Sequence, residues 1–249
     1  MTTIPFSNTS LVRDIVNEVP KTSDVFKKYR IDFCCGGNTP ISTAAAEQNV
    51  NLDELMEELA NVYAKSDQSD NMEVWTNSTS EEIIQHVIEH YHNPLREELA
   101  ALSPYVTKVA KVHSDNHPEL LKVYKLFYEL KKELLEHTAK EEATSFPLLL
   151  SLEKNEVENR EEAIEEIRKL ESEHDHAGNI LKELRTITAD FTPPLDACGT
   201  YRLVYSRLEM LEAHTFMHVH LEIIFYSRVI FNESKKPAVK YLLVFTLHR

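Results

Sequence analysis

Glycine, cysteine and positive charge are all scarce in this chain of 249 residues. Only four glycines occur beside abundant Glu, Leu, Lys and Ala, which favours an all-α protein. Three cysteines, an odd number, do not make a disulfide framework, so we expect a reducing, cytoplasmic location. The formal net charge of −14 argues against nucleic acid and against anionic membrane surfaces as partners.

Long apolar runs are missing as well. No run reaches the length of about 18 residues that a transmembrane helix needs. The first ten residues lack the cationic and apolar regions of a signal peptide, which agrees with the cytoplasmic expectation. The chain is long enough to build one large domain or two smaller ones, each with a full core.

Residues 1–62 are predicted to form a small helical domain that carries two adjacent cysteines. Cys34 and Cys35 lie in the stretch D-F-C-C-G-G at 32–37. Their Cα atoms are about 3.8 Å apart, which is shorter than an ordinary disulfide prefers. Two interpretations stay open: a thiol pair that binds metal or exchanges electrons, and a tight turn with two small buried residues.

A polar stretch without periodicity follows, and we interpret residues 63–78 as a linker. Residues 79–230 contain four long helical patterns with short connections, which predict an up-down four-helix bundle. We expect Pro94 to kink the first long helix just past His92, and Pro104 to mark its end.

Polar residues interrupt the apolar faces of all four predicted long helices. The sequence H-x-x-x-E occurs twice, on the second and on the fourth helix, and places the two side chains one helical turn apart on one face. A buried His or Glu is costly unless it is satisfied, so the recurrence indicates a metal site. The candidate ligands are His92, His137, Glu141, His174, His218 and Glu222.

Six imidazole and carboxylate donors suit two first-row metal ions, which the carboxylates can bridge. This donor mixture fits iron better than magnesium or calcium, and zinc usually takes four ligands in structural sites. We therefore expect two non-haem iron ions, which an oxo or hydroxo group could also bridge, with positions left open for water, oxygen or NO.

The other histidines are interpreted without a metal. A lone histidine on an apolar face is most often a satisfied core residue, and we assign this role to His86, His90 and His214. We expect His113 and His117 at a turn, and His176 and His220, off the apolar stripe, at the surface. The glutamates between 153 and 173 are interpreted as a solvated helix face.

Motifs from both ends of the chain resemble the iron-sulfur cluster repair di-iron proteins. D-F-C-C-G-G, followed by an Ala-rich segment, resembles the N-terminal domain of that family. The following stretches resemble its hemerythrin-like domain: Y-H-x-P-L-R-E-E at 91–98, L-x-P-Y-V-T-K-V-x-K-V-H at 102–113, H-x-x-K-E-E at 137–142, S-E-H-D at 172–175, P-P-x-x-A-C-G-T-x-R-L-V-Y at 193–205 and H-V-H-L-E at 218–222.

This resemblance implies a cytoplasmic homodimer that restores iron-sulfur clusters damaged by oxidative and nitrosative stress, with the damaged proteins as partners. The iron ligands of the family fall on the six residues named above, and its adjacent cysteines fall on Cys34 and Cys35. Ser114 stands where the family usually has glycine.

Two other functions stay open. A hemerythrin-type carrier or sensor of oxygen or NO would use an additional histidine, for which His214, one turn before His218, is the candidate. An interaction domain without metal is the other alternative. No catalytic triad or substrate pocket is inferred, so the sequence leaves enzymatic activity undecided.

The tail departs from the family pattern after Glu222. Where the family continues with something like E-N-N-I-L-F-P-R, this chain has E-I-I-F-Y-S-R at 222–228. Deleting one A from the codons GAA AAT AAT ATT TTA TTC CCG CGT converts the first sequence into the second. We hypothesise that residues 223–249 are a frameshifted tail, atypical from 231 onwards, whose apolar residues the bundle is not shaped to bury.

Overall fold

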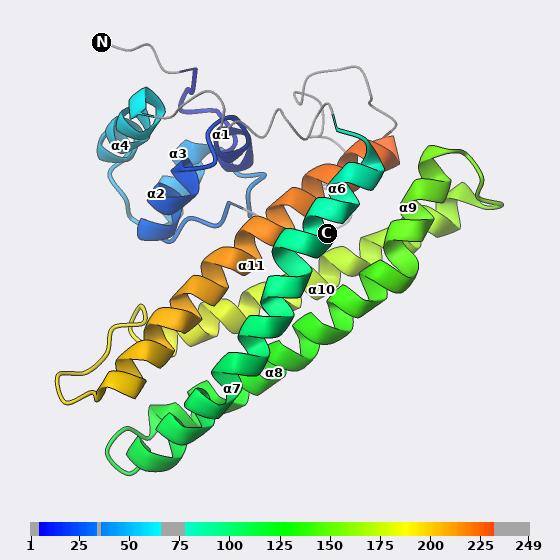
Figure 1. The fold of residues 1–249 in the computed structure, drawn as a ribbon. Coiled ribbons are helices and arrows are strands. Elements are labelled where there is room, and N and C mark those ends of the chain that lie inside the picture. Colours follow the sequence, from blue (N-terminus) through cyan, green and yellow to red (C-terminus); the bar gives the residue numbers. More distant parts are fainter. Residues whose placement is uncertain (1–4, 34–35, 66–77, 232–249) are drawn as a thin grey trace. The chain divides into compact units, whose positions relative to one another are not determined.

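The computed structural model describes residues 5–33, 36–65 and 78–231. The chain divides into two compact units, one within residues 1–79 and one comprising 80–232, and each is described by itself (Figure 1). The described residues form helices and no strand, which confirms the all-α prediction. None of the described helices is both long enough and apolar enough to cross a membrane.

The described residues of the N-terminal unit form four helices: α1 (Val12–Glu18), α2 (Thr22–Lys28), α3 (Ile41–Glu47) and α4 (Leu52–Lys65). Asn51 caps α4, because its side-chain oxygen accepts hydrogen bonds from the backbone N–H groups of Asp53 and Glu54 at 2.9 and 3.4 Å. Residues 63–65, predicted as linker, belong to this helix. The remaining linker residues from 66 to 77 lie outside the described residues.

The turn beside the cysteine pair depends on a glycine. A Cβ atom on Gly37 would lie 2.2 Å from the carbonyl oxygen of Phe33, so no other residue fits without a backbone shift. The carbonyl of Gly37 accepts a hydrogen bond of 3.0 Å from the backbone N–H of Arg13, the second residue of α1. Cys34 and Cys35 themselves lie outside the described residues.

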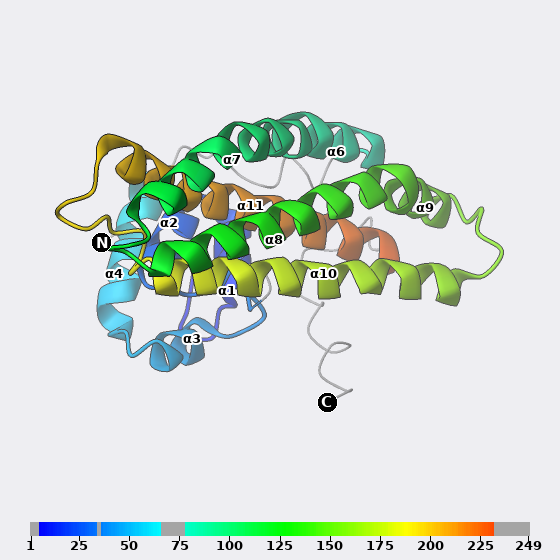
Figure 2. The same ribbon diagram turned by 90° about the horizontal axis from the view of Figure 1, so that it is seen from below.

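The second unit contains four long helical rods, and Figure 2 shows them running side by side. The rods pack in the cyclic order α7, α8, α10 and α11, with a further contact between α9 and α11, around a core of leucine, valine and aromatic side chains. The rods are α6 (Ser80–Val87), η2 (Ile88–His92) and α7 (Asn93–His113); α8 (Glu119–Lys140), η3 (Glu141–Ser145) and α9 (Phe146–Glu153); α10 (Arg160–Ile187); and α11 (Gly199–Phe231).

Two π-helical turns, η2 and η3, interrupt the first two rods, each followed by a proline two residues later. Pro94 has no N–H, so it leaves the carbonyl of His90 without its α-helical partner. That carbonyl lies 3.3 Å from Nε2 of His214, which donates to it. A π-helical turn therefore stands where the sequence predicts a kink. The expectation that Pro104 marks the end of the helix is wrong, because α7 continues to His113.

The end of α11 corrects the view of the tail. Helix α11 continues nine residues beyond Glu222 to Phe231, and Phe225, Tyr226, Val229 and Ile230 are buried. The backbone carbonyl of Ile230 accepts a hydrogen bond of 3.0 Å from Arg160. The expectation that this stretch adds unburied apolar surface is wrong for these residues. Residues 232–249 lie outside the described residues.

Candidate metal centre

The six candidate ligands come together inside the bundle, and all six side chains are buried. Two overlapping groups of four share Glu141 and Glu222, and within each group the donor atoms lie within 4.8 Å of one another. One group adds His92 and His218, and the other adds His137 and His174. The helical spacing of four residues places each H-x-x-x-E pair on one inward face, whereas His92 ends η2 and His174 lies within α10.

The imidazoles face one another in pairs. The Nε2 atoms of His92 and His218 are 3.0 Å apart, and those of His137 and His174 are 2.9 Å apart. Two nitrogens that bind one ion at right angles, with bonds of about 2.1 Å, would also be about 3 Å apart. Each pair is thus spaced like two ligands of a single ion.

Each shared carboxylate presents one oxygen to each imidazole pair. Glu141 Oε1 lies 3.1 Å from Nε2 of His137, and its Oε2 lies 3.4 Å from Nε2 of His92. Glu222 Oε1 lies 2.7 Å from Nε2 of His218, and its Oε2 lies 3.2 Å from Nε2 of His174. This is the arrangement of two carboxylates that can bridge a pair of ions.

Unsatisfied oxygens support a cation at this position. Oε2 of Glu141 and both carboxylate oxygens of Glu222 are buried and accept no hydrogen bond from the described residues. Buried carboxylates are costly without hydrogen bonds or a cation. The donor set therefore fits metal ions, and its four imidazoles favour a first-row transition metal over magnesium or calcium.

Two further carboxylates orient the histidines. Glu142 Oε1 lies 2.7 Å from Nδ1 of His92, and the same oxygen accepts a hydrogen bond of 2.7 Å from Arg96. Glu173 Oε2 lies 2.8 Å from Nδ1 of His137. Such a carboxylate holds the proton on Nδ1 and leaves the Nε2 lone pair for a metal.

The second of these residues corrects the sequence analysis. Glu173 is half-buried against His137 and Lys140, so its interpretation as part of a solvated face is wrong. The signal available in the sequence was adjacency, because Glu142 follows the candidate ligand Glu141 and Glu173 precedes His174.

Comparison with known proteins agrees with both units. Residues 8–63 match a family described as a domain of unknown function, DUF542, and residues 83–227 match the hemerythrin HHE cation binding domain. The iron-sulfur cluster repair protein ScdA of Staphylococcus haemolyticus is 40% identical over 227 residues, which cover 91% of this chain and 98% of that protein. The chain belongs to the ScdA and YtfE family.

Proteins of other bacteria are similar at lower identity. The probable iron-sulfur cluster repair protein of Haemophilus influenzae is 32% identical over 209 residues, or 84% of this chain and 91% of that protein. The iron-sulfur cluster repair protein YtfE of Escherichia coli O1:K1 / APEC is also 32% identical, over 84% of this chain and 90% of its own length. The family membership predicted from the motifs is thereby confirmed.

Opposite charges face each other across the site. Burial alone would lower the pKa of His92, but the carboxylates of Glu141 and Glu222 raise it to about 9. Burial is likewise outweighed at His137, where Glu141 and Glu173 raise the pKa to about 10. The hydrogen bond from His137 outweighs burial at Glu173 and, together with Lys140, lowers its pKa to about 2.

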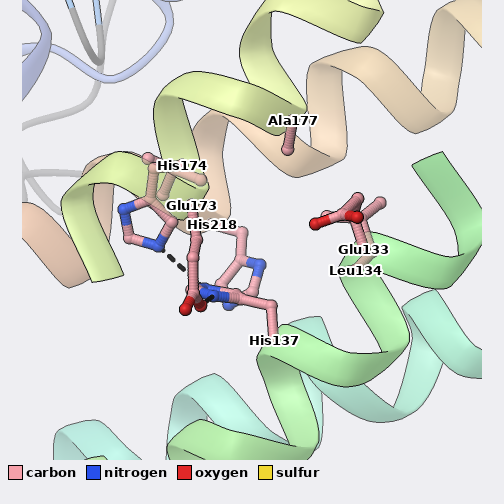
Figure 3. A pocket seen from close by; sticks show the side chains of 8 residues that line it. Glu133, Leu134, His137, Glu173, His174, Ala177 and His218 are labelled. Atoms are coloured by element: carbon pink, nitrogen blue, oxygen red, sulfur yellow. Dashed lines mark hydrogen bonds and ion pairs between the residues drawn. The ribbon is translucent and has the colours of Figure 1, made fainter. Parts of the chain in front are cut away.

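A small pocket adjoins the imidazoles of one group (Figure 3). His137 and His174 point toward each other in this view. Glu133 and Leu134 line the pocket from α8, and Ala177 lines it from α10. An aromatic residue closes the centre from α11: the hydroxyl of the fully buried Tyr226 donates a hydrogen bond to Oε1 of Glu141. Burial raises the pKa of Tyr226 well above its usual value, which keeps this hydroxyl protonated.

The remaining histidines divide differently from expectation. His90 is exposed and stacks on His86, so its interpretation as a core residue is wrong. His220 is 2% exposed, which contradicts its assignment to the surface. His214 is half-buried, and its Nε2 donates a hydrogen bond to the carbonyl of His90. It belongs to neither group of metal donors found among the described residues.

Proposed function

We propose that this chain is an iron-sulfur cluster repair protein whose bundle holds two iron ions on the six-residue site. The observation that carries the proposal is the pair of four-donor groups that share Glu141 and Glu222. Relatives named iron-sulfur cluster repair proteins align with most of the chain. Iron bound here would supply a reservoir for damaged clusters or a binding position for NO.

In this proposal the protein binds iron reversibly. Glu141 and Glu222 are the only anionic side chains among the six donors. They therefore neutralise only two of the positive charges that two iron ions carry. Ferrous ions should be held more loosely than ferric ones. His92 and His137 are kept in the metal-binding tautomer by Glu142 and Glu173, so rebinding requires no rearrangement of these rings.

The test is iron content and cluster repair in the full chain. Purified protein should carry about two irons per chain and show oxo-bridged ferric absorption. Glu141→Ala/Glu222→Ala should lose this iron and no longer reactivate an enzyme with a damaged cluster, while its helical circular dichroism persists. Glu136→Ala, an exposed change on α8, is the matched control. Full iron retention in the double variant would sink the proposal.

A carrier or sensor of oxygen or NO is the less favoured function. It needs an additional histidine ligand, and the one candidate for that position, His214, donates to a backbone carbonyl instead. A stable oxygen adduct of the reduced protein would favour this second function over repair.

The cysteine pair has a separate proposed role. Cys34 and Cys35 belong to the region matched as its own family, apart from the bundle, and we assign them to iron transfer or electron delivery. Cys34→Ser/Cys35→Ser should retain bundle iron and lose repair activity, whereas Cys198→Ser, which replaces an exposed free cysteine, should lose neither. Undiminished repair by the double variant would reject this role.

Family membership also supports a cytoplasmic homodimer that acts on damaged iron-sulfur proteins under oxidative and nitrosative stress. Light scattering on the purified protein tests the dimer directly, and a monomeric mass at working concentration would refute it.

A further inference from the structure

The two halves of the candidate metal centre are built alike. In each half, a carboxylate orients one histidine and is itself bonded to a basic side chain. Glu142 orients His92 and is bonded to Arg96. Glu173 orients His137 and is bonded to Lys140. The second histidine of each half, His218 or His174, has an Nδ1 atom with no hydrogen-bond partner in the part of the chain that the structure describes. The histidines and their supports therefore give no reason for one ion to be held more tightly.

Aromatic rings also cover imidazoles in both halves. Tyr91 stacks on His218 with the ring centroids 5.4 Å apart and the planes at 12°. Phe146 stacks on His92 with the ring centroids 5.7 Å apart and the planes at 14°. Tyr226 lies over His174 at 6.4 Å and 11°. Phe146 and Tyr226 are both buried, and these two side chains differ by a single hydroxyl group.

That hydroxyl engages one of the four bridging oxygens. It donates to Oε1 of Glu141, the oxygen that faces His137 at 3.1 Å. The other oxygen of Glu141, which faces His92, and both oxygens of Glu222 accept no hydrogen bond from any described residue. A hydrogen bond to a carboxylate oxygen withdraws electron density from it, so Oε1 is the weakest of the four metal donors.

We propose that Tyr226 makes the two metal positions unequal, so that the ion held by His137 and His174 is released first. This inference rests on the proposed di-iron function and adds to it which ion is delivered. Tyr226 acts as a positioning residue, because it reaches the metal only through Glu141.

The experiment measures iron release from the reduced, iron-loaded full chain into an excess of a ferrous chelator. We expect two phases of equal amplitude in the natural sequence. In Tyr226→Phe the fast phase should slow by about tenfold, the scale of one hydrogen bond to a charged group, and merge with the slow phase. Mössbauer spectra of the ferric protein should show two distinct iron environments that become more alike in the variant.

Three further variants make the test specific. Tyr205→Phe removes another buried hydroxyl, which contacts Tyr201, and should leave both phases unchanged. His174→Asn should remove the fast phase, and His218→Asn should remove the slow one.

The inference is overturned if Tyr226→Phe binds two irons and releases them with the rates of the natural sequence, or if its release becomes faster. Such a result would leave the di-iron proposal standing. A natural chain that binds no iron would overturn both.

Discussion

At the scale of single residues, the carboxylates beside the candidate ligands determine how two of the ligands are oriented. Glu142 and Glu173 are each about one third exposed, yet each contacts Nδ1 of a buried histidine. Burial alone would raise the pKa of Glu142, but the hydrogen bonds from His92 and Arg96 lower it. Both groups therefore remain anionic at neutral pH and fix the orientation of the imidazole that each one touches.

Removing these carboxylates should weaken metal binding without unfolding the bundle. We expect Glu142→Ala and Glu173→Ala each to lower iron affinity by about 10- to 100-fold, because the imidazole then loses its fixed tautomer and orientation. Chelator competition measures the affinity, and circular dichroism measures the helix content. Glu136→Ala is the control, since that residue is exposed on the same helix as His137. Unchanged affinity in both variants would contradict the orienting role.

At the scale of helices, periodicity explains what could be predicted. Val204, Leu208 and Leu211 lead into His218 at helical spacing, and the buried positions of these residues follow from that pattern. The π-helical turns could not be derived in this way, because the extra residue in each one shifts the buried face by one position. Ile83 and Val87 are buried before η2, and Leu95 and Leu99 are buried after it. Pro94 predicted an irregularity in this helix, but it did not predict that the irregularity would be a π-helical turn.

The connection between α10 and α11 shows a contact that periodicity also misses. Three successive residues adopt the left-handed conformation although none of them is glycine. The φ values are 49° for Ala189, 58° for Asp190 and 53° for Phe191. Arg185 holds this turn: it bonds Asp190 at 3.2 Å, lies over the ring of Phe191, and bonds the buried carboxylate of Glu212 through Nε at 2.8 Å. One guanidinium thus stabilises both the strained turn and a buried charge.

Loss of this guanidinium should destabilise the bundle strongly. Arg185→Met leaves the carboxylate of Glu212, 1% exposed, without its partner, and we expect the free energy of unfolding to fall by about 3–5 kcal/mol. Urea denaturation followed by circular dichroism measures the change. Arg168→Met removes a charge from an exposed pair on the same helix and should cost less than about 1 kcal/mol.

A double variant checks the cause. Arg185→Met/Glu212→Leu removes the stranded charge and should recover part of the lost stability. Equal stability of Arg185→Met and Arg168→Met would show that the buried pair contributes nothing.

At the scale of the whole molecule, the sequence predicted the all-α architecture and the family, but misjudged the chain's last described turns. The motifs that resemble the family end at Glu222, although the match to the hemerythrin HHE domain runs to residue 227. From the motifs alone, the following residues looked foreign to the bundle. Sequence comparison cannot show whether a substituted residue finds a complementary position. Here Phe225 and Tyr226 follow Glu222 at spacings of three and four, so the helix turns both of them inward. The frameshift remains a hypothesis, tested by whether the neighbouring frame of the gene encodes N-N-I-L-F-P-R.

The concentration of opposite charges in the bundle makes the stability of the metal-free protein dependent on pH. His92 and His137 have folded-state pKa values of about 9 and 10, above their ordinary value of 6.5. Their protonation therefore stabilises the fold fully below pH 6.5, and this contribution is lost as the pH rises through 9 to 10. On the acid side, Glu173 has a pKa of about 2 against 4.5, so its contribution is lost as the pH falls through that range.

The metal-free protein should accordingly have its highest melting temperature between about pH 4.5 and 6.5, with a decline toward pH 10. The iron-loaded protein should not show this alkaline decline, because imidazoles that bind a metal are already neutral. Thermal unfolding of both forms across this pH range, followed by circular dichroism, provides the measurement. His137→Asn should flatten the alkaline decline of the metal-free form, whereas His176→Asn, at an exposed position of α10, should preserve it. A metal-free protein whose melting temperature is constant or rises from pH 7 to 10 would show that the buried imidazoles are not held protonated by their carboxylates.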